Sequence, residues 1–215
     1  TRKIMEKIKT KSDFHFLRKL WHAAPGISVV LILQMQLLPK DQLIKILSSI
    51  YLLATMTEMI RLSNDTFNSF LFKFAKFVMR EEEKNRPSGL VWYLFSVTGS
   101  LYFLPTELAG LNILYLAIGD PFASIVGLSM KDHPYNKKFS NGKSLFGSIG
   151  LSLMILNITL LYGYALQLPI LPLAYKGLAA CLVGFLTEMI PFKLDDNLLI
   201  PLFTGIALYS VSFYF

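Results

Sequence analysis

Apolar residues fall into seven long runs separated by shorter polar segments. The runs cover residues 23–38, 43–60, 90–104, 107–126, 145–166, 170–190 and 198–215. A helix rises about 1.5 Å per residue, so runs of this kind approach or exceed the length needed to cross a bilayer. The pattern predicts an all-α, polytopic integral membrane protein with about seven transmembrane helices.

Composition supports the same class. Hydrophobic residues make up 53% of the 215 residues, charged residues 16%, and the mean hydropathy is +0.50, whereas soluble domains are nearer 25% charged. The single cysteine, Cys181, lies in an apolar run. It cannot form an intrachain disulfide, and we interpret it as a small core residue.

The net charge of +7 is explained by orientation rather than by a nucleic-acid partner. All but three of the 21 Lys and Arg residues lie before the first run or in every second intervening segment; the exceptions are Lys40, Lys45 and Lys176. The positive-inside rule then predicts a cytoplasmic N-terminus and a C-terminus on the opposite side. The membrane would be a bacterial inner membrane or the endoplasmic reticulum.

The chain reads as a single membrane-embedded domain over residues 1–215, without an internal repeat. Three polar segments stand out within it. Residues 1–22 are basic and amphipathic, and residues 61–89 mix Phe and Leu with charged residues, as in a cytoplasmic interfacial helix. Residues 127–147 form a candidate nucleotide-phosphate loop.

Unusual polar residues fall at the predicted cytoplasmic ends of the runs. Charged groups at membrane depth are costly and are more often functional than structural. Their convergence predicts an active site at the cytoplasmic face. The residues are Arg18, Lys19, His22, Glu58, Arg61, Asp120, Ser124, Lys143, Ser144, Ser148, Glu188, Asp195, Asp196 and Asn197.

Asp120 is the most informative of these residues. The proline that follows it disfavours helical geometry, so the fourth helix should kink or break at 119–121. Broken helices are tolerated in membranes where they line a site. Ala123, Ser124 and Gly127 would give a small-residue face that a ligand can approach closely.

The segment after this helix has features that suit a phosphate. Its lysines supply positive charge, its glycines allow close backbone approach, and the helix opening at Ser144 would attract anions. It is not a Walker A loop, because the required earlier glycine is absent. The candidate residues are Lys137, Lys138, Gly142, Lys143, Ser144, Gly147 and Ser148.

Two further groups have competing interpretations. Glu188 and Asp196 offer carboxylates that suit Mg²⁺; Asp195 is equally well explained as a solvated loop residue. Glu58 and Arg61 are three residues apart, so they predict either an ion pair that orders a helix end or a direct role in the site.

These elements, in this order, resemble the CTP-dependent polyprenol kinase family, which includes dolichol kinase, phytol kinase and the CTP-dependent diacylglycerol kinase. The matching motifs are Arg18-Lys19-Leu20-Trp21-His22 with Gly26, Glu58-Met59-Ile60-Arg61, Gly119-Asp120-Pro121-Phe122-Ala123-Ser124 with Gly127, Gly142-Lys143-Ser144 with Gly147-Ser148, and Asp195-Asp196-Asn197 with Pro201. One departure is Phe146, where related sequences often have Glu.

The resemblance implies a kinase that transfers the γ-phosphate of CTP to the hydroxyl of a membrane lipid: a polyprenol or dolichol, phytol, or diacylglycerol. The CTP-binding region of the family carries over to Asp120, Ala123, Ser124, Gly127, Lys143, Ser144 and Gly147. With the residue chemistry above, we predict further nucleotide-binding residues Arg18, Lys19, Gly142 and Ser148, and Mg²⁺ held by Asp120 and by Asp196 or Glu188. The predicted catalytic residues are Asp120, Lys143, Glu58, Arg61 and His22, with Asp120 and Glu58 as candidates to orient or deprotonate the alcohol.

Two alternatives stay open. A CTP:phosphatidate cytidylyltransferase shares the acidic, small-residue and Lys-Ser elements, but its long acidic C-terminal signature is lacking here. A membrane transporter could use Asp120 as an ion site; such sites usually lie near the midplane and between repeats, and neither holds here. The lipid acceptor, the oligomeric state and the division of roles among the carboxylates are undefined by the sequence.

Overall fold

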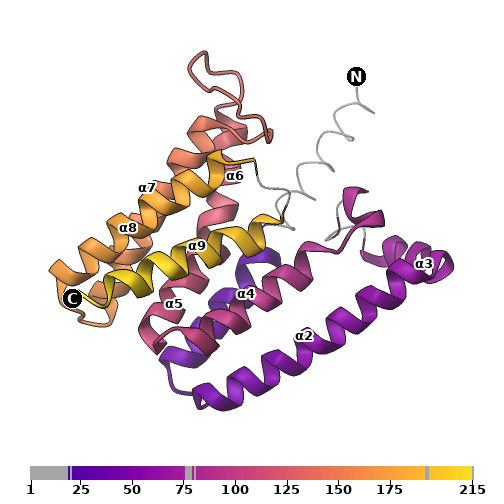
Figure 1. Cartoon of the computed structure of the whole chain (residues 1–215), viewed down its shortest axis with the longest axis horizontal. Helices are drawn as coiled ribbons and strands as arrows, with labels where there is room; N and C mark the ends of the chain where they lie inside the picture. Colours follow the sequence, from indigo (N-terminus) through magenta and orange to yellow (C-terminus); the bar gives the residue numbers. More distant parts are fainter. Residues whose placement is uncertain (1–18, 20, 76–78, 80, 192–193, 215) are drawn as a thin grey trace, which may run out of the picture.

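Helices occupy all seven predicted places in the structure, a computed structural model that describes residues 19, 21–75, 79, 81–191 and 194–214. Within that part of the chain the only β pairing is an isolated bridge between Lys138 and Ser144. The fourth place holds three continuous helical segments, α5, η2 and α6 (Figure 1). The elements at the seven places are Trp21–Gln34, α2 (Lys40–Ser63), α4 (Gly89–Phe103), α5 (Thr106–Leu114) with η2 (Tyr115–Gly119) and α6 (Asp120–Ser129), α7 (Leu145–Ala165), α8 (Ile170–Met189) and α9 (Asp196–Val211).

Among the residues that the structure describes, four helices are long and apolar enough to cross a membrane: Lys40–Ser63, Thr106–Ser129, Leu145–Ala165 and Ile170–Met189. The other three apolar helices are shorter. The 16 residues of α9, for example, reach roughly 24 Å at about 1.5 Å per residue, less than the hydrocarbon core. An integral membrane protein is supported, while the count of seven spans stays a prediction.

The segment 61–89 does not form the single interfacial helix that we predicted. α2 continues through Ser63, a short helix α3 covers Asp65–Ala75, and a 3₁₀ turn covers Glu81–Asn85. Asn64 divides them: its extended backbone ends α2, and its side-chain oxygen accepts a hydrogen bond from the N–H of Phe67 at 3.0 Å, which caps α3.

For residues 119–121 we predicted a kink or a break, and the structure shows no break. Gly119 and Asp120 have helical φ angles of −63° and −62°, and the helix is continuous from Thr106 to Ser129. A single π-helical turn, Tyr115–Gly119, precedes the proline. Such a turn changes the hydrogen-bond register locally, so the missing proline N–H is accommodated by a distortion instead of a break.

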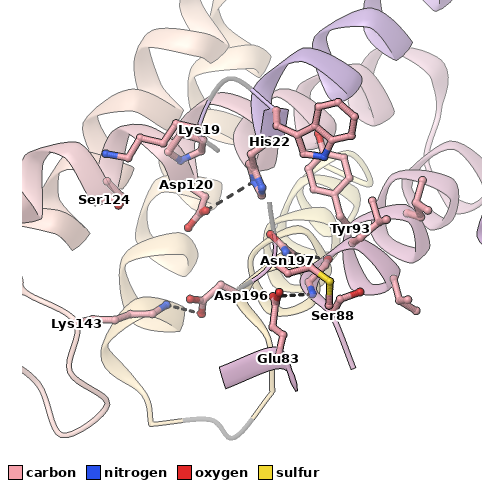
Figure 2. Close-up of a pocket in the computed structure, with 18 of the residues that line it drawn as sticks. Lys19, His22, Glu83, Ser88, Tyr93, Asp120, Ser124, Lys143, Asp196 and Asn197 are labelled. Atoms are coloured by element: carbon pink, nitrogen blue, oxygen red, sulfur yellow. Dashed lines mark hydrogen bonds and ion pairs between the residues drawn. The ribbon is translucent and has the colours of Figure 1, made fainter. Parts of the chain in front are cut away.

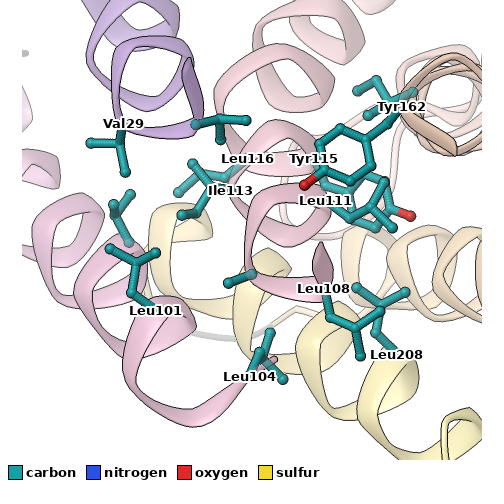
Figure 3. Close-up of a cluster of buried hydrophobic side chains, with 14 of the residues drawn as sticks. Val29, Leu101, Leu104, Leu108, Leu111, Ile113, Tyr115, Leu116, Tyr162 and Leu208 are labelled. Atoms are coloured by element: carbon teal, nitrogen blue, oxygen red, sulfur yellow. The ribbon is translucent and has the colours of Figure 1, made fainter. Parts of the chain in front are cut away.

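The centre of the bundle is the α5–η2 segment. Leu111, Tyr115 and Leu116 have no exposed surface, and Figure 3 shows them among side chains from neighbouring helices. The hydroxyl of Tyr115 shares a 2.6 Å hydrogen bond with Oγ1 of Thr159. Cys181 packs against this core as a free, partly buried residue, as predicted.

Close packing of α7 on α8 fixes the relative positions of two helix ends that contribute to the functional site described below. A side chain at Gly177 would meet Thr159 at 2.9 Å, and one at Gly184 would meet Ile155 at 2.7 Å. Small residues of this kind let membrane helices approach closely. Because α7 and α8 are antiparallel neighbours, the start of α7 and the end of α8 lie at the same end of the bundle (Figure 1).

A buried polar network holds α9 against α4 and α5. The amide of Asn112 donates to Oγ of Ser100 at 3.0 Å and to the carbonyl of Pro201 at 2.9 Å. Its oxygen accepts a hydrogen bond from Oγ1 of Thr204 at 2.7 Å. Every polar group of the Asn112 side chain is therefore used, and α9, which begins at Asp196, is fixed in place.

Candidate functional site

A cavity of about 890 Å³ lies at the end of the bundle where the predicted polar residues meet. Its lining comes from the first helix, α2, α4, α6, α7, α8 and α9. The structure therefore brings the predicted residues together, while their roles and the side of the membrane stay predictions. Predicted residues in the lining are Lys19, His22, Glu58, Arg61, Asp120, Ala123, Ser124, Gly127, Lys138, Gly142, Lys143, Ser144, Gly147, Glu188, Asp196 and Asn197. Arg18 lies outside the described residues.

Three carboxylates gather at one point of the cavity. Asp120, Glu188 and Asp196 each offer an oxygen, and these oxygens lie within 4.8 Å of one another. They come from the starts of α6 and α9 and from the end of α8. Hard divalent cations such as Mg²⁺ prefer carboxylate oxygens, so the donor set fits the predicted metal.

Lys143 lies against two of these carboxylates. Its ammonium is 2.7 Å from Oε1 of Glu188 and 2.5 Å from Oδ1 of Asp196, and Figure 2 shows the latter contact. Burial by itself lowers the pKa of Lys143, but the charges of Asp196 and Glu188 outweigh it and raise the pKa above its usual value. Lys143 is therefore a cation at neutral pH, and it balances one of the three negative charges.

Two polar residues hold Glu188 and Lys143 in this arrangement by hydrogen bonds. Asn141 donates to the carbonyl of Glu188 at 2.9 Å and accepts from the N–H of Lys143 at 3.0 Å. Ser148 donates to Oε2 of Glu188 at 3.4 Å and is fully buried. Sequence reasoning missed Asn141, although an Asn-Gly pair is a strong turn signal; it placed Ser148 on the nucleotide, whereas the structure puts it behind Glu188.

The start of α7, which we expected to attract anions, does not present free amides to a phosphate. Its first four N–H groups all donate within the protein. Their acceptors are the carbonyl of Lys137 for Leu145, Oδ1 of Asn136 for Phe146, Oγ of Ser144 for Gly147 and the carbonyl of Ser144 for Ser148. Anion contacts here would involve side chains and the helix macrodipole.

The small residues of α6 pack directly on α7. A side chain at Gly127 would lie 2.7 Å from Oγ of Ser144, and one at Gly147 would lie 3.2 Å from the carbonyl of Ala123. The glycines therefore serve helix packing at the cavity wall. Ser124, in contrast, is an exposed residue of the lining (Figure 2).

His22 lies beside Asp120 at the wall formed by the first helix. Its Nε2 is 3.7 Å from Oδ2 of Asp120, and its ring meets that of Tyr93 edge-on at 4.8 Å between centroids (Figure 2). Sequence reasoning did not identify Tyr93, because a tyrosine in an apolar run carries no signal of the direction in which it points.

Glu58 and Arg61 form the predicted ion pair, and it is buried. Arg61 is 1% exposed; its Nη2 donates to Oε1 of Glu58 at 2.6 Å and its Nε donates to Oε2 at 3.0 Å. The same guanidinium donates to the side chain of Asn68 and to the carbonyls of Glu83, Lys84 and Arg86. Glu58 also accepts from the N–H of Ser88 at 2.6 Å. The pair fixes the segment that leads into α4.

Curated relatives of this chain share one name. The CTP-dependent diacylglycerol kinase 1 of Schizosaccharomyces pombe is 30% identical over 206 residues, which cover 90% of this chain and 92% of the relative. The protein of that name in Saccharomyces cerevisiae is 24% identical over 212 residues, covering 90% of this chain and 72% of the relative. The one in Eremothecium gossypii is 26% identical over 172 residues, covering 72% and 54%. Neither a family model nor a solved structure matches the chain significantly.

Proposed function

The chain belongs to the CTP-dependent lipid kinase family, and from this premise we propose that it transfers the γ-phosphate of CTP to the hydroxyl of diacylglycerol. The observation that carries the proposal is the cluster of Asp120, Glu188 and Asp196 with Lys143, at one end of a bundle of apolar helices. Diacylglycerol is preferred to polyprenols, dolichol and phytol because the relatives are named for it.

Asp120, Glu188 and Asp196 would hold Mg²⁺, since each offers a carboxylate oxygen within 4.8 Å of the other two. When bound, the ion would neutralise phosphate charge and orient the transferred group. Glu188 is kept in place for this role by Ser148 and Asn141.

The lysines at the cavity would bind the triphosphate. Lys19, Lys131 and Lys138 line the cavity together with Lys143, and side-chain ammonium groups replace the amides that the start of α7 does not offer. Lys143 would stabilise the charge that develops during transfer. Gly142, Ser144 and Ser124 line the same wall and would contact the nucleotide. We place this site on the cytoplasmic side, following the distribution of basic residues.

His22 and Asp120 would lie next to the hydroxyl group of the lipid acceptor. The lipid oxygen forms a bond to the γ-phosphorus, the bond from that phosphorus to the β–γ bridging oxygen breaks, and CDP leaves. The hydroxyl proton passes to a neighbouring base. His22 suits this role, because the carboxylate of Asp120, which has an oxygen 3.7 Å from His22 Nε2, would stabilise the protonated imidazole.

The function is tested with purified protein, Mg²⁺ and CTP labelled separately on the γ-phosphate or on cytidine, offered with diacylglycerol, phytol, polyprenols and phosphatidate. Label from the γ-phosphate in diacylglycerol is expected. Transfer to another alcohol would correct the acceptor alone. Cytidine label in the lipid would indicate a cytidylyltransferase, and no labelled lipid with either CTP or ATP would favour transport.

We also predict that Glu58 and Arg61 act as positioning residues. Glu58→Gln and Arg61→Lys should each lower the free energy of unfolding by about 3 kcal/mol, since breaking a buried ion pair leaves a charge without its partner. At temperatures where the variants stay folded, kcat should fall less than about tenfold, well short of the loss of a catalytic group. Thermal unfolding and kcat measured on the same samples check this. A loss of kcat of roughly 10³-fold in a fully folded variant would instead make the pair catalytic.

A further inference from the structure

Part of the wall of the cavity that contains the acidic cluster is apolar, and we call this part the apolar arm. This arm is bounded by the first helix, α2 and α4, and its walls are mainly hydrocarbon. The lining residues that form it are Trp21, Pro25, Ala54, Leu90, Val91 and Leu94.

The stripe that α2 presents to the cavity changes from apolar to charged along its length. Ala54, Thr57, Glu58 and Arg61 all line the cavity, and their spacing places them on one face of the helix. Ala54 lies in the apolar arm, and the last two lie near the segment that leads into α4. A ligand that matches this wall has one polar end and one apolar end.

The apolar arm lies beside α2, the least buried of the four long apolar helices. Only 11% of the apolar stretch of α2 is buried, and α2 runs along the edge of the bundle away from α7 and α8 (Figure 1). Trp21 is 56% exposed and Leu90 48% exposed. A hydrocarbon chain in the bilayer would therefore reach this arm from the side, without passing through water.

We propose that the groove between Trp21–Gln34, α2 and α4 holds a hydrocarbon tail of the lipid acceptor, which enters laterally between the first helix and α2. This rests on the proposed kinase function and adds the location of the acceptor. The tail lies along Ala54 and Leu94, and the hydroxyl reaches the junction at His22, Tyr93 and Asp120, which belong to the same cavity.

The change from apolar to charged residues along the groove favours a lipid over a helix from a second copy of the chain. A transmembrane helix of another copy would present an apolar surface along its whole length, and Asp120, whose side chain is 24% exposed in this cavity, would then face hydrocarbon at high cost. A lipid alcohol instead ends in groups that can form hydrogen bonds, at the point where the groove becomes polar.

The first test fills the groove. Ala54→Trp and Leu94→Trp should each raise KM for long-chain diacylglycerol at least about tenfold, equivalent to about 1.4 kcal/mol, with KM for CTP unchanged. The matched control is Leu53→Trp, which adds the same ring to the neighbouring residue; Leu53 is 64% exposed and does not line the cavity. Unchanged acceptor KM in both folded groove variants would overturn the proposal. The proposal would also be overturned if the wild type were a dimer and the groove variants were monomers with an unchanged KM. Light scattering measures this, and that result would make the groove an interface between copies.

The second test needs no variant to fold. Diacylglycerol with a diazirine at the end of one acyl chain is irradiated with the wild-type protein, and the labelled peptides are mapped. Label near Ala54 or Leu94, competed by unmodified diacylglycerol, is the expected result; label confined to α7 and α8 overturns the groove. If labelling occurs in the groove but no lipid alcohol is phosphorylated, the proposed function fails while lipid binding in the groove stands. If the lipid is phosphorylated but the label lies outside the groove, the proposed function stands and the proposed groove is overturned.

Discussion

Replacing Asp120 with asparagine is expected to lower kcat for phosphoryl transfer by roughly 10²–10³-fold in a protein that still folds. Asparagine preserves the size of the side chain but removes one of the three negative charges that converge within 4.8 Å. It also removes the carboxylate 3.7 Å from His22 Nε2, so both the proposed metal site and the proposed base lose a partner.

Folding should survive this change because Asp120 is not a structural cap. Its backbone is helical, its side chain is 24% exposed, and removing one of three neighbouring like charges relieves repulsion. Thermal unfolding in detergent and kcat with CTP and diacylglycerol test both points. Asp41→Asn, an exposed aspartate in the first turn of α2, is the control. A wild-type kcat for Asp120→Asn would remove the residue from the mechanism.

Features that depend on periodicity and on helix direction could be predicted from the sequence. Every apolar run became a helix, because burying backbone polar groups in an apolar setting demands complete hydrogen bonding. Alternating helix directions then brought Asp120, Lys143, Glu188 and Asp196 to one end, although 76 residues separate the first from the last. No short-range motif was needed for that inference.

The sequence did not allow us to predict which hydrogen-bond partner each polar group would find. The local rule that a proline ends a helix was overridden at Asp120 by a π-helical turn. The amides at the start of α7 were assigned to an anion, but the preceding loop uses them through Asn136 and the carbonyl of Lys137. Periodicity fixes the face of a helix, whereas packing between helices decides what that face meets.

The second large effect is expected at Lys143. Replacing it with alanine should lower kcat by about 10²–10³-fold, because the proposed triphosphate and transition-state charge lose the cation nearest to the acidic cluster. Unlike the change at Asp120, it should also destabilise the fold, by about 2 kcal/mol. Glu188, 5% exposed at its side chain, would be left buried without its counterion, while the 34% exposure of Asp196 moderates the loss.

The stability difference should be constant from pH 7 to 9. The pKa of Lys143 is raised above its usual value of 10.5 by Asp196 and Glu188, despite the opposing effect of burial. Its stabilising contribution is therefore complete below that usual value and is lost only as the pH rises through the raised pKa. A difference that disappears between pH 7 and 9 would contradict the ion pairs seen here.

Measurements with Mg²⁺ distinguish two proposed roles of Lys143, which are pairing with the carboxylates and binding the nucleotide. Without nucleotide, the ammonium and the metal compete for the oxygens of Glu188 and Asp196, so Lys143→Ala should bind Mg²⁺ more tightly than the wild type. Adding Mg²⁺ should then raise the melting temperature of the variant more than that of the wild type, since at a given concentration a ligand of higher affinity stabilises the folded state more. Lys176→Gln, a change on the side opposite the cluster in the predicted topology, should alter neither kcat nor the response to Mg²⁺. Equal Mg²⁺ responses in wild type and Lys143→Ala would mean that the ammonium and the metal do not share these carboxylates, and Lys143 would then act on the nucleotide alone.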